Sequence, residues 1–470
     1  MPRPSSCKCS LFGLLLLLCG SPFAQAGDPP ASPAASDSAE LARRVRAEFV
    51  HAWEGYKRYA WGHDELKPLG RTARDWYGET LLMTPVDALD TMLLMGLTEE
   101  AERTKALLVQ SLSFDKDISV KNFEVTIRIL GGLLSSYQMT GDRRLLALAE
   151  DVGNRLLPVF ASPTGMPYMF VNLKTGKTNG ARSNPAEIGT LILELGTLSR
   201  LTGRVVFYDK AKAALVELYK RRAKTGLVGE EIDVETGQWT SPLSHVGGGI
   251  DSYYEYLVKC EKLFGDQECG RMWPESLRAV NAFVADERPD GLWYGEADMR
   301  TGRRTASTYG ALQAFFPAVL VLAGDLARAR RLQDSGFRMW TLHGIEPEIF
   351  DYRSLRVVEP GYALRPEIIE SAYYLSHATR DPRYVEMGRT IFEDLLRFCR
   401  TDSGYATLAS VLTKEKGDLM PSYFLSETLK YLYLLFDPEA LDFDSVVFNT
   451  EAHPLRRTSR RPQIREAPRH

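Results

Sequence analysis

The stretch from Phe123 to Asp142, FEVTIRILGGLLSSYQMTGD, carries the pattern that decides the fold. It is rich in Leu, Ile, Tyr and Gly at helical spacing, which predicts a helix that faces the protein interior. Gly141-Asp142 ends this helix, and a more charged helix follows. The repeating unit is therefore a helical hairpin with an apolar inner helix and a charged outer helix.

The same kind of turn recurs along the chain, at intervals of 45 to 62 residues. The seven turns fall at Gly96, Gly141-Asp142, Gly203, Gly265-Asp266, Gly324-Asp325, Asp381-Pro382 and Asp437-Pro438. With an opening helix near Ser38 to Ala60, they predict about fourteen helices in seven hairpins. A period near 60 in a chain of 470 residues favours a ring that closes on itself, an all-α (α/α)7 barrel. An open solenoid is the alternative, but its terminal repeats would resemble caps, and these do not.

Short segments with β-strand character interrupt the helices on the connections that lead into the inner ones. They are Gly165 to Gly180, Ile232 to Gln238, Gly291 to Gly302, Tyr405 to Asp418 and Ser445 to Glu451. We expect them to form short β-hairpins at one mouth of the barrel. Loops on one face of a rigid scaffold are where binding and catalytic residues are usually found.

The first 26 residues have the three parts of a secretory signal peptide: a positive start with Arg3 and Lys8, an apolar stretch, and the cleavage site Ala24-Gln25-Ala26. We expect a signal peptide at 1–26, a flexible linker at 27–36, the catalytic barrel at 37–454 and a basic disordered tail at 455–470. No later segment reaches about 18 uninterrupted apolar residues, so no stable membrane insertion is expected. The signal predicts export, to the periplasm or the medium of a bacterium. The ER lumen and a lipoprotein anchored through Cys19 are the less favoured alternatives.

The balance of charge excludes nucleic acid as a partner. The chain has a net charge of -3, and six arginines lie in its last sixteen residues. The barrel itself is therefore mildly acidic and has no basic stripe for a phosphate backbone.

Cysteine usage excludes a disulfide-rich scaffold. Three of the six cysteines lie in the signal peptide, which leaves Cys260, Cys269 and Cys399. Cys260 and Cys269 lie nine residues apart across a predicted helix turn. They either pair or remain two buried thiols, and the sequence leaves this open.

Acidic residues recur near the start of the apolar inner helices. They are Asp87, Asp90, Glu124, Glu187, Asp251, Glu367, Glu370 and Glu427. One such acid would be explained by the helix dipole. Their recurrence at matched positions before the turns predicts that the acids converge on one cavity.

A ring of carboxylates with aromatic neighbours is typical of a sugar site. Paired acids cleave glycosidic bonds, because one protonates the leaving oxygen while the other activates water or attacks. The aromatic candidates are Phe123, Tyr253, Tyr254, Tyr374 and Tyr423, with core packing favoured for Tyr253 and Tyr254.

Other site chemistries lack support. The chain has no Gly-x-x-x-x-Gly-Lys phosphate loop, and its seven histidines show no His-x-x-x-His spacing, so phosphate transfer and a zinc site are disfavoured. A hard cation with oxygen ligands remains possible among so many carboxylates.

Blocks in the same order along about residues 45–455 resemble the class I α-mannosidases, glycoside hydrolase family 47. They are Tyr59 to Leu66, Phe123 to Gly132, Pro163 to Tyr168, Asp251 to Lys259, Leu364 to Glu367, Glu427 to Phe436 and Asn449 to Glu451. Gly70 to Thr72, Leu312 to Pro317, Gly324-Asp325 and Gly404 to Leu408 are more similar to the ER-degradation-enhancing α-mannosidase-like branch. With the export signal, they indicate a bacterial member.

The resemblance implies an (α/α)7 barrel, a Ca²⁺ ion at its base, and hydrolysis of terminal α-1,2-linked mannose with inversion. Glu124 resembles the general acid, acting through a water, and Glu367 the general base. Asp251 is the third essential carboxylate, and which of Glu124 and Asp251 delivers the proton stays open.

The remaining site residues are also implied by the resemblance. Thr450 corresponds to the residue that gives Ca²⁺ its protein ligands, and the acids that hold the neighbouring waters correspond to Glu187, Glu370, Glu427 and Glu451. Arg128 and Arg365 resemble the arginines that hold the charges of the site and the sugar, with a neutralising partner for Glu367 as an equally favoured role of Arg365. Tyr423 stands where the family stacks an aromatic ring on mannose.

Two departures leave the preferred glycan branch open. Processing enzymes of the family carry a histidine where this chain has Ala311 to Phe316, and some carry a bulky residue near Gly249.

The leading hypothesis is an exported, Ca²⁺-dependent exo-α-mannosidase that acts as a monomer on a high-mannose oligosaccharide or glycoprotein. One alternative is a lectin-like recognition protein with little turnover. Against it, all three essential carboxylates are present. The other alternative is a barrel glycosidase for another mannoside linkage.

Overall fold

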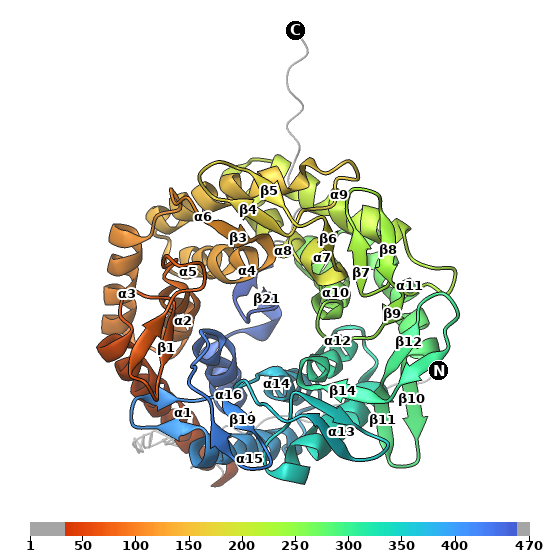
Figure 1. Ribbon diagram of the computed structural model, residues 1–470. Helices are drawn as coiled ribbons and strands as arrows, with labels where there is room; N and C mark the ends of the chain where they lie inside the picture. Colours follow the sequence, from red (N-terminus) through yellow and green to blue (C-terminus); the bar gives the residue numbers. More distant parts are fainter. Residues whose placement is uncertain (1–32, 458–470) are drawn as a thin grey trace, which may run out of the picture.

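The computed structural model describes residues 33–457, with side chains from residue 37 onward. Its helices form two concentric rings (Figure 1). The inner ring consists of α2 (Met83–Leu94), α4 (Asn122–Glu124) running through the π-helix η1 (Val125–Leu130) into α5 (Gly131–Thr140), α7 (Pro185–Gly189) with α8 (Ile192–Thr202), α10 (Asp251–Phe264), η3 (Ala311–Phe315) with α12 (Phe316–Leu322), α14 (Glu367–Thr379), and the π-helix η4 (Phe424–Thr428) with α16 (Leu429–Phe436). The outer ring consists of α1 (Pro33–Tyr59), α3 (Thr98–Ser111), α6 (Arg143–Leu156), α9 (Val206–Lys220), α11 (Gln267–Phe283), α13 (Leu326–His343) and α15 (Arg383–Phe398). Three short 3-10 turns complete the helical elements: η2 (Leu157–Ala161), η5 (Pro438–Ala440) and η6 (Phe443–Ser445).

The predicted (α/α)7 barrel is confirmed, and the way it closes explains the count of hairpins. Six inner helices are each followed by the outer helix that packs on them, whereas α16 packs against α1 from the other end of the described chain. The first outer helix is thus the partner of the last inner one. α1 begins at Pro33, whereas the sequence placed the start of the barrel at residue 37. Proline is tolerated in the first turn of a helix, and the two alanines that follow favour helix.

The Gly-Asp turns have a local physical cause. Gly141 ends α5 in the left-handed region, with φ of +71°, where a side chain would be strained. Asp142 then caps α6, because its Oδ1 accepts a hydrogen bond from the backbone N–H of Arg144 at 3.0 Å. Gly203 and Gly265 end α8 and α10 in the same way. One dipeptide therefore both stops the inner helix and starts the outer one.

Short strands lie on the connections from outer to inner helices. They are β1 (Glu65–Lys67), β2 (Thr72–Arg74), β3 (Ser119–Lys121), β4 (Phe170–Asn172), β5 (Thr178–Asn179), β6 (Arg182–Ser183), β7 (Glu231–Asp233), β8 (Gln238–Ser241), β9 (Leu243–Ser244), β10 (Ala285–Arg288), β11 (Gly291–Tyr294), β12 (Glu296–Asp298), β13 (Arg304–Ala306), β14 (Thr308–Gly310), β15 (Ile349–Asp351), β16 (Arg356–Glu359), β17 (Arg400–Thr401), β18 (Gly404–Tyr405), β19 (Leu408–Ser410) and β20 (Glu415–Lys416). All their pairings are antiparallel, and several join neighbouring repeats, as β6 with β7 and β9 with β12. They surround one mouth of the barrel, seen from the front in Figure 1. Of these strands, the segments expected from the sequence left out β1, β2, β3, β6, β9, β10, β13, β14, β15, β16 and β17.

The hairpin β21 (Val446–Phe448) and β22 (Pro454–Arg456) corrects one expectation. The sequence placed Ser445 to Glu451 at the same mouth as the other hairpins, but this hairpin follows α16 and lies inside the ring of inner helices (Figure 1). The chain leaves α16 at the end of the barrel opposite to this mouth, and it enters the interior from that end. The ordered barrel extends through Arg456, two residues beyond the expected boundary.

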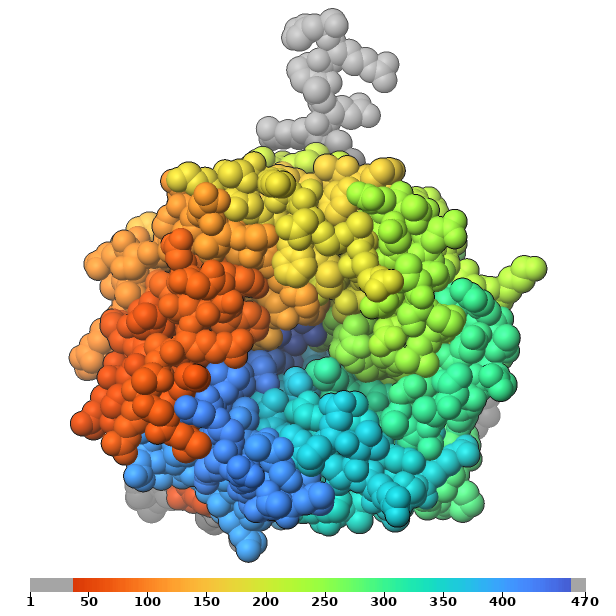
Figure 2. Space-filling model, in the orientation of Figure 1, coloured from red at the N-terminus to blue at the C-terminus, as the bar shows by residue number. Residues whose placement is uncertain are grey.

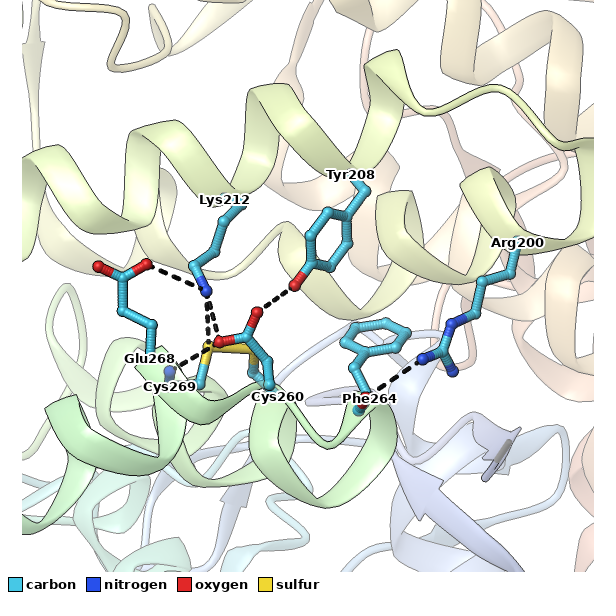
Figure 3. The surroundings of a disulfide bond; sticks show 8 residues. Arg200, Tyr208, Lys212, Cys260, Phe264, Glu268 and Cys269 are labelled. Atoms are coloured by element: carbon cyan, nitrogen blue, oxygen red, sulfur yellow. Dashed lines mark hydrogen bonds and ion pairs between the residues drawn. A yellow bond between two sulfur atoms is a disulfide. The ribbon is translucent and has the colours of Figure 1, made fainter. Parts of the chain in front are cut away.

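Cys260 of α10 and Cys269 of α11 form a disulfide bond with their Cα atoms 6.0 Å apart, so the pairing that the sequence left open does occur (Figure 3). Beside it, Asp266 accepts from Lys212 Nζ at 2.5 Å. Cys399 is a buried free thiol.

Some sequence predictions fall outside the described residues. The signal peptide, the first part of the linker and the tail from residue 458 lie there. Among residues 33–457, no helix is long and apolar enough to cross a membrane.

Candidate active site

A pocket of about 280 Å³ lies in the middle of the ring, at the central hollow visible in Figure 2. It is lined by every residue that the sequence assigned to catalysis, substrate or metal: Glu124, Arg128, Glu187, Asp251, Arg365, Glu367, Glu370, Tyr423, Glu427, Thr450 and Glu451. Most come from the first turns of inner helices, and Thr450 and Glu451 come from the turn of the β21–β22 hairpin. Residues from the two ends of the barrel therefore meet in one pocket.

The fold explains why the acids gather here. Asp251 and Glu367 are the first residues of α10 and α14, and Glu187 lies in the first turn of α7. Because the inner helices start at the same mouth, the N-terminal turns of α4, α7, α10 and α14 face the pocket, where the helix dipole favours negative charge. The two π-helices also contribute, since η1 contains Arg128 and η4 contains Glu427. Such insertions are frequent at functional sites.

Arg128 is the central cation of the pocket floor. Its Nε donates to Glu124 Oε2 at 2.9 Å and its Nη1 to Glu451 Oε2 at 2.5 Å. Burial favours the neutral guanidinium, but Glu451, Glu124 and Asp87 outweigh it and hold the pKa of Arg128 well above its usual value. Arg128 is therefore a fixed positive charge that orients two carboxylates.

Arg365 forms its ion pair with a residue other than Glu367, the partner considered in the sequence analysis. Its Nη2 donates to Glu348 Oε2 at 2.9 Å, and its Nε lies 3.2 Å from both carboxylate oxygens of Glu348. The ion pair is thus with Glu348, although the charge of Arg365 also acts on Glu367. The Tyr423 ring lies between the two arginines, 5.5 Å from the Arg128 guanidinium and 5.8 Å from that of Arg365.

The catalytic candidates differ in how they hold protons. Burial raises the pKa of Glu367 to about 8, against the opposing effect of Arg365. Burial also raises the pKa of Asp251 to about 6, although the N–H of Ser252 donates to its carboxylate at 2.7 Å. Glu124 Oε2 lies 2.9 Å from Arg128 Nε, which fixes the position of this carboxylate.

The other acids of the pocket also resist ionisation. Burial raises the pKa of Glu370 to about 8 and those of Glu187 and Glu451 to about 7. Burial and the neighbouring Glu451 raise the pKa of Glu427 well above its usual value. The acids outnumber the cations that line the pocket, so its charges are balanced only if the acids keep protons or a cation joins them.

Two predicted members of the acidic ring lie elsewhere. Asp87 and Asp90 are fully buried and do not line the pocket. They sit deeper along α2, where they contact His453 and Lys430. The β21–β22 hairpin fills that level of the barrel, which the sequence pattern of the inner helices does not reveal.

The aromatic candidates divide in a similar way. Phe123 and Tyr423 line the pocket. Tyr253, Tyr254 and Tyr374 are buried in the core, as favoured for the first two.

Several pocket residues were missed. Lys121 forms an ion pair with Glu187 at 2.7 Å, and Glu255 lies one turn below Asp251 and contacts buried Lys259. The i, i+4 spacing from Asp251 was the signal for Glu255. Glu348, which pairs with Arg365 but does not itself line the pocket, lies on the connection from α13 to β15, 17 residues before Arg365, with no local pattern that marks it.

The two departures noted in the sequence both face the pocket. Leu312 and Phe315 of η3 line it where processing enzymes carry a histidine, and Gly249 lines it directly before α10. These positions therefore border the space that a glycan would enter.

Comparison with known proteins agrees with the fold. The chain matches glycosyl hydrolase family 47 over residues 48–457. It is 37% identical over 475 residues to ER degradation-enhancing alpha-mannosidase-like protein 2 of Homo sapiens, covering 93% of this chain and 81% of that protein. It is also 37% identical over 466 residues to endoplasmic reticulum mannosyl-oligosaccharide 1,2-alpha-mannosidase of Homo sapiens, covering 91% and 66%.

A solved structure shows the same architecture. Alpha-1,2-mannosidase from Trichoderma reesei superposes with a TM-score of 0.81 at 26% identity, covering 89% of this chain and 99% of that one. The chain belongs to glycosyl hydrolase family 47 and is a glycoside hydrolase of the class I α-mannosidase type. The predicted relationship, including that to the ER-degradation-enhancing branch, is confirmed.

Proposed function

We propose that this protein is an exported, Ca²⁺-dependent exo-α-mannosidase that removes terminal α-1,2-linked mannose from high-mannose glycans with inversion, as a monomer. The observation that carries the proposal is the single pocket that Glu124, Asp251, Glu367 and Thr450 line together. The relatives are named as 1,2-alpha-mannosidases, and this supplies the proposed linkage.

The pocket fits a hard cation. Thr450 offers oxygen ligands, and Glu187, Glu370, Glu427 and Glu451 line the same pocket. One carboxylate oxygen of Glu187 and one of Glu367 are buried without a hydrogen-bond partner, as expected of groups that await a ligand or water. When bound, Ca²⁺ would supply a fixed positive charge for sugar hydroxyls and favour the ionised carboxylates.

We assign the role of general base to Glu367 and the role of general acid, which delivers the proton, to Asp251. Ionised Glu367, favoured by the charge of Arg365, would accept a proton from the attacking water. Asp251 keeps its proton to higher pH than an ordinary aspartate, as a general acid must. Glu124, held in place by its hydrogen bond from Arg128, would orient the water or sugar next to it. Tyr423 offers a ring to the sugar face.

Export is supported by the signal-like N-terminus and by the Cys260–Cys269 disulfide, since such bonds persist in oxidising compartments.

The test is to incubate the mature protein with a high-mannose oligosaccharide, first with Ca²⁺ and then with chelator, and to follow the released sugar by NMR. Prompt β-mannose that disappears with chelator supports the proposal. α-Mannose would contradict inversion, and release that persists with chelator would contradict the metal. Glycan binding without release would indicate a recognition protein instead, and release only from other linkages would indicate a different mannosidase.

A further inference from the structure

The turn at 449–453, which joins β21 to β22, is held in the centre of the barrel by many hydrogen bonds and ion pairs. Thr450 and Glu451 face the pocket, while the side chains of Asn449 and His453 are fully buried. Asn449 and His453, which flank the pocket-facing pair in the chain, therefore attach the turn to the inner helices.

Asn449 fixes the turn to itself and to the ring. Its Oδ1 accepts from the N–H groups of Glu451 at 2.9 Å and His453 at 2.8 Å. Its Nδ2 donates to the carbonyl of Ile127 and to Glu194 Oε1, both at 2.8 Å. One side chain thus sets the shape of the turn and ties it to η1 and α8.

His453 ties the turn to α2, and Lys430 ties it to α16. Its Nδ1 lies 2.7 Å from Asp90 Oδ2 and its Nε2 lies 3.3 Å from Asp87 Oδ1, so both ring nitrogens face carboxylates. Lys430 Nζ lies 2.7 Å from Asp90 Oδ1 and also donates to the carbonyl of Ala452 at 2.7 Å. Two cations and two anions therefore balance in a group with no solvent exposure.

The inner helix α5 makes room for the turn with two glycines. A Cβ at Gly131 would lie 2.6 Å from Asn449 Nδ2 and 3.1 Å from the His453 ring. A Cβ at Gly132 would lie 3.2 Å from the same ring and 2.8 Å from Val86. The Gly131-Gly132 pair in the opening sequence pattern is thus explained by the close approach of this turn.

Apolar side chains would fill the barrel at a lower free-energy cost than buried charged groups. Buried ionic groups are often replaced by hydrophobic ones without loss of stability, so their presence indicates a need for one defined position. We propose that Asn449 and His453, seated on Gly131-Gly132 and held by Asp87, Asp90 and Lys430, are positioning residues that fix Thr450 and Glu451 at the pocket floor. This inference rests on the proposed function, because the position matters through Ca²⁺ and through Glu451's bond to Arg128.

The test compares Ca²⁺ affinity, measured by calorimetry well below the unfolding temperature, among four proteins. These are the wild type, His453→Gln, Thr450→Ala as the reference for a lost ligand, and His377→Gln as the matched control. His377 stacks on Phe443 at 4.2 Å and does not line the pocket. Groups that orient metal ligands typically contribute about 10- to 100-fold in affinity, so we expect His453→Gln to weaken Ca²⁺ binding by that factor and His377→Gln to leave it unchanged. Activity of His453→Gln should recover at saturating Ca²⁺.

A second variant keeps the test decisive if His453→Gln does not fold. His453→Asn retains a donor near the shorter contact, to Asp90, and we expect a smaller loss of affinity. If a folded His453 variant unfolds at lower temperature but binds Ca²⁺ like the wild type, the role is only structural and the inference is wrong, while the proposed function stands. If the wild type binds no Ca²⁺, the metal in the proposed function fails and the inference fails with it.

Discussion

Nη1 of Arg128 lies 2.5 Å from Oε2 of Glu451, although 323 positions separate the two residues in the chain. The contact joins the π-helix η1 to the turn of the β21–β22 hairpin, and so connects the ring to the hairpin that fills it. A planar guanidinium is suited to this place because its fork reaches Glu124 and Glu451 at once.

Arg128→Lys therefore tests whether the forked shape of the guanidinium is needed, because it keeps the positive charge. One ammonium cannot satisfy both carboxylates in the same geometry, and we expect kcat/KM to fall about 100-fold, the cost of a small misplacement at a reacting centre. Steady-state kinetics on a mannobiose would measure this. The matched control is Arg144→Lys, which alters a two-bond pair with Asp142 on the surface and should leave the rate unchanged. Equal rates for Arg128→Lys and the wild type would show that charge alone suffices.

Glu367→Gln should abolish turnover while sparing sugar binding. The amide keeps the shape of the side chain but cannot accept the proton of the attacking water, and we expect kcat to fall by at least about 1,000-fold. Calorimetry with an oligomannose would then report affinity without hydrolysis. Glu386→Gln, on the exposed start of α15, serves as control. If Glu367→Gln kept near-full activity, the base would have to be another carboxylate of the pocket.

The roles of Asp251 and Glu124 can be separated with a substrate whose leaving group needs no proton. Asp251→Asn should lose about 1,000-fold on a mannobiose, the scale of general acid catalysis, yet retain most of its activity on α-mannosyl fluoride. Glu124→Gln should lose activity on both substrates, because it orients water or sugar and does not supply the proton. Rates measured on the two substrates check the assignment, and the reverse pattern would give the proton to Glu124.

The helical repeat made the ring predictable because its cause is local. A left-handed glycine ends each of several inner helices, and an aspartate such as Asp142 caps the next helix, so the dipeptide is visible in the sequence. The same repeat places acids at helix starts, which is why Asp251 and Glu367 were found. The position of the β21–β22 hairpin was not predictable, because its contacts span more than 300 residues.

The errors have the same origin. Asp87 and Asp90 share the helix-start pattern of the pocket acids, and only the presence of His453 beside them makes them part of a buried ionic group. Glu348 was missed because its role depends on Arg365, which reaches it across a loop. The roles of the site residues in Ca²⁺ binding and catalysis remain predictions.

The Cys260–Cys269 disulfide should contribute stability without contributing to chemistry. It closes a short loop between α10 and α11 and does not line the pocket. Loop-closure entropy gives about 2–3 kcal/mol for a loop of this size. We expect the Cys260→Ser/Cys269→Ser double variant to lose that much in the free energy of unfolding by denaturant titration, with kcat unchanged. Cys399→Ala, at the free thiol, is the control for replacing a buried sulfur, and a kcat loss only in the double variant would assign the bond a role in the site.

The stability of the metal-free protein should fall as the pH rises from about 4.5 to about 8. Burial raises the pKa of Glu367 and Glu370 to about 8 and that of Glu451 to about 7, so between these values and the unfolded pKa near 4.5 the folded state binds more protons. Stability is then fully present below the unfolded pKa and decreases as the pH passes through that window. Ca²⁺ should reverse the trend, because a bound cation favours the ionised acids and binds more tightly as they lose protons. Calorimetric unfolding temperatures at pH 5, 6.5 and 8, with chelator and with Ca²⁺, measure both effects. A chelated protein that becomes more stable between pH 5 and 8, or a Ca²⁺ effect that is largest at pH 5, would show that the pocket acids are ionised without a cation.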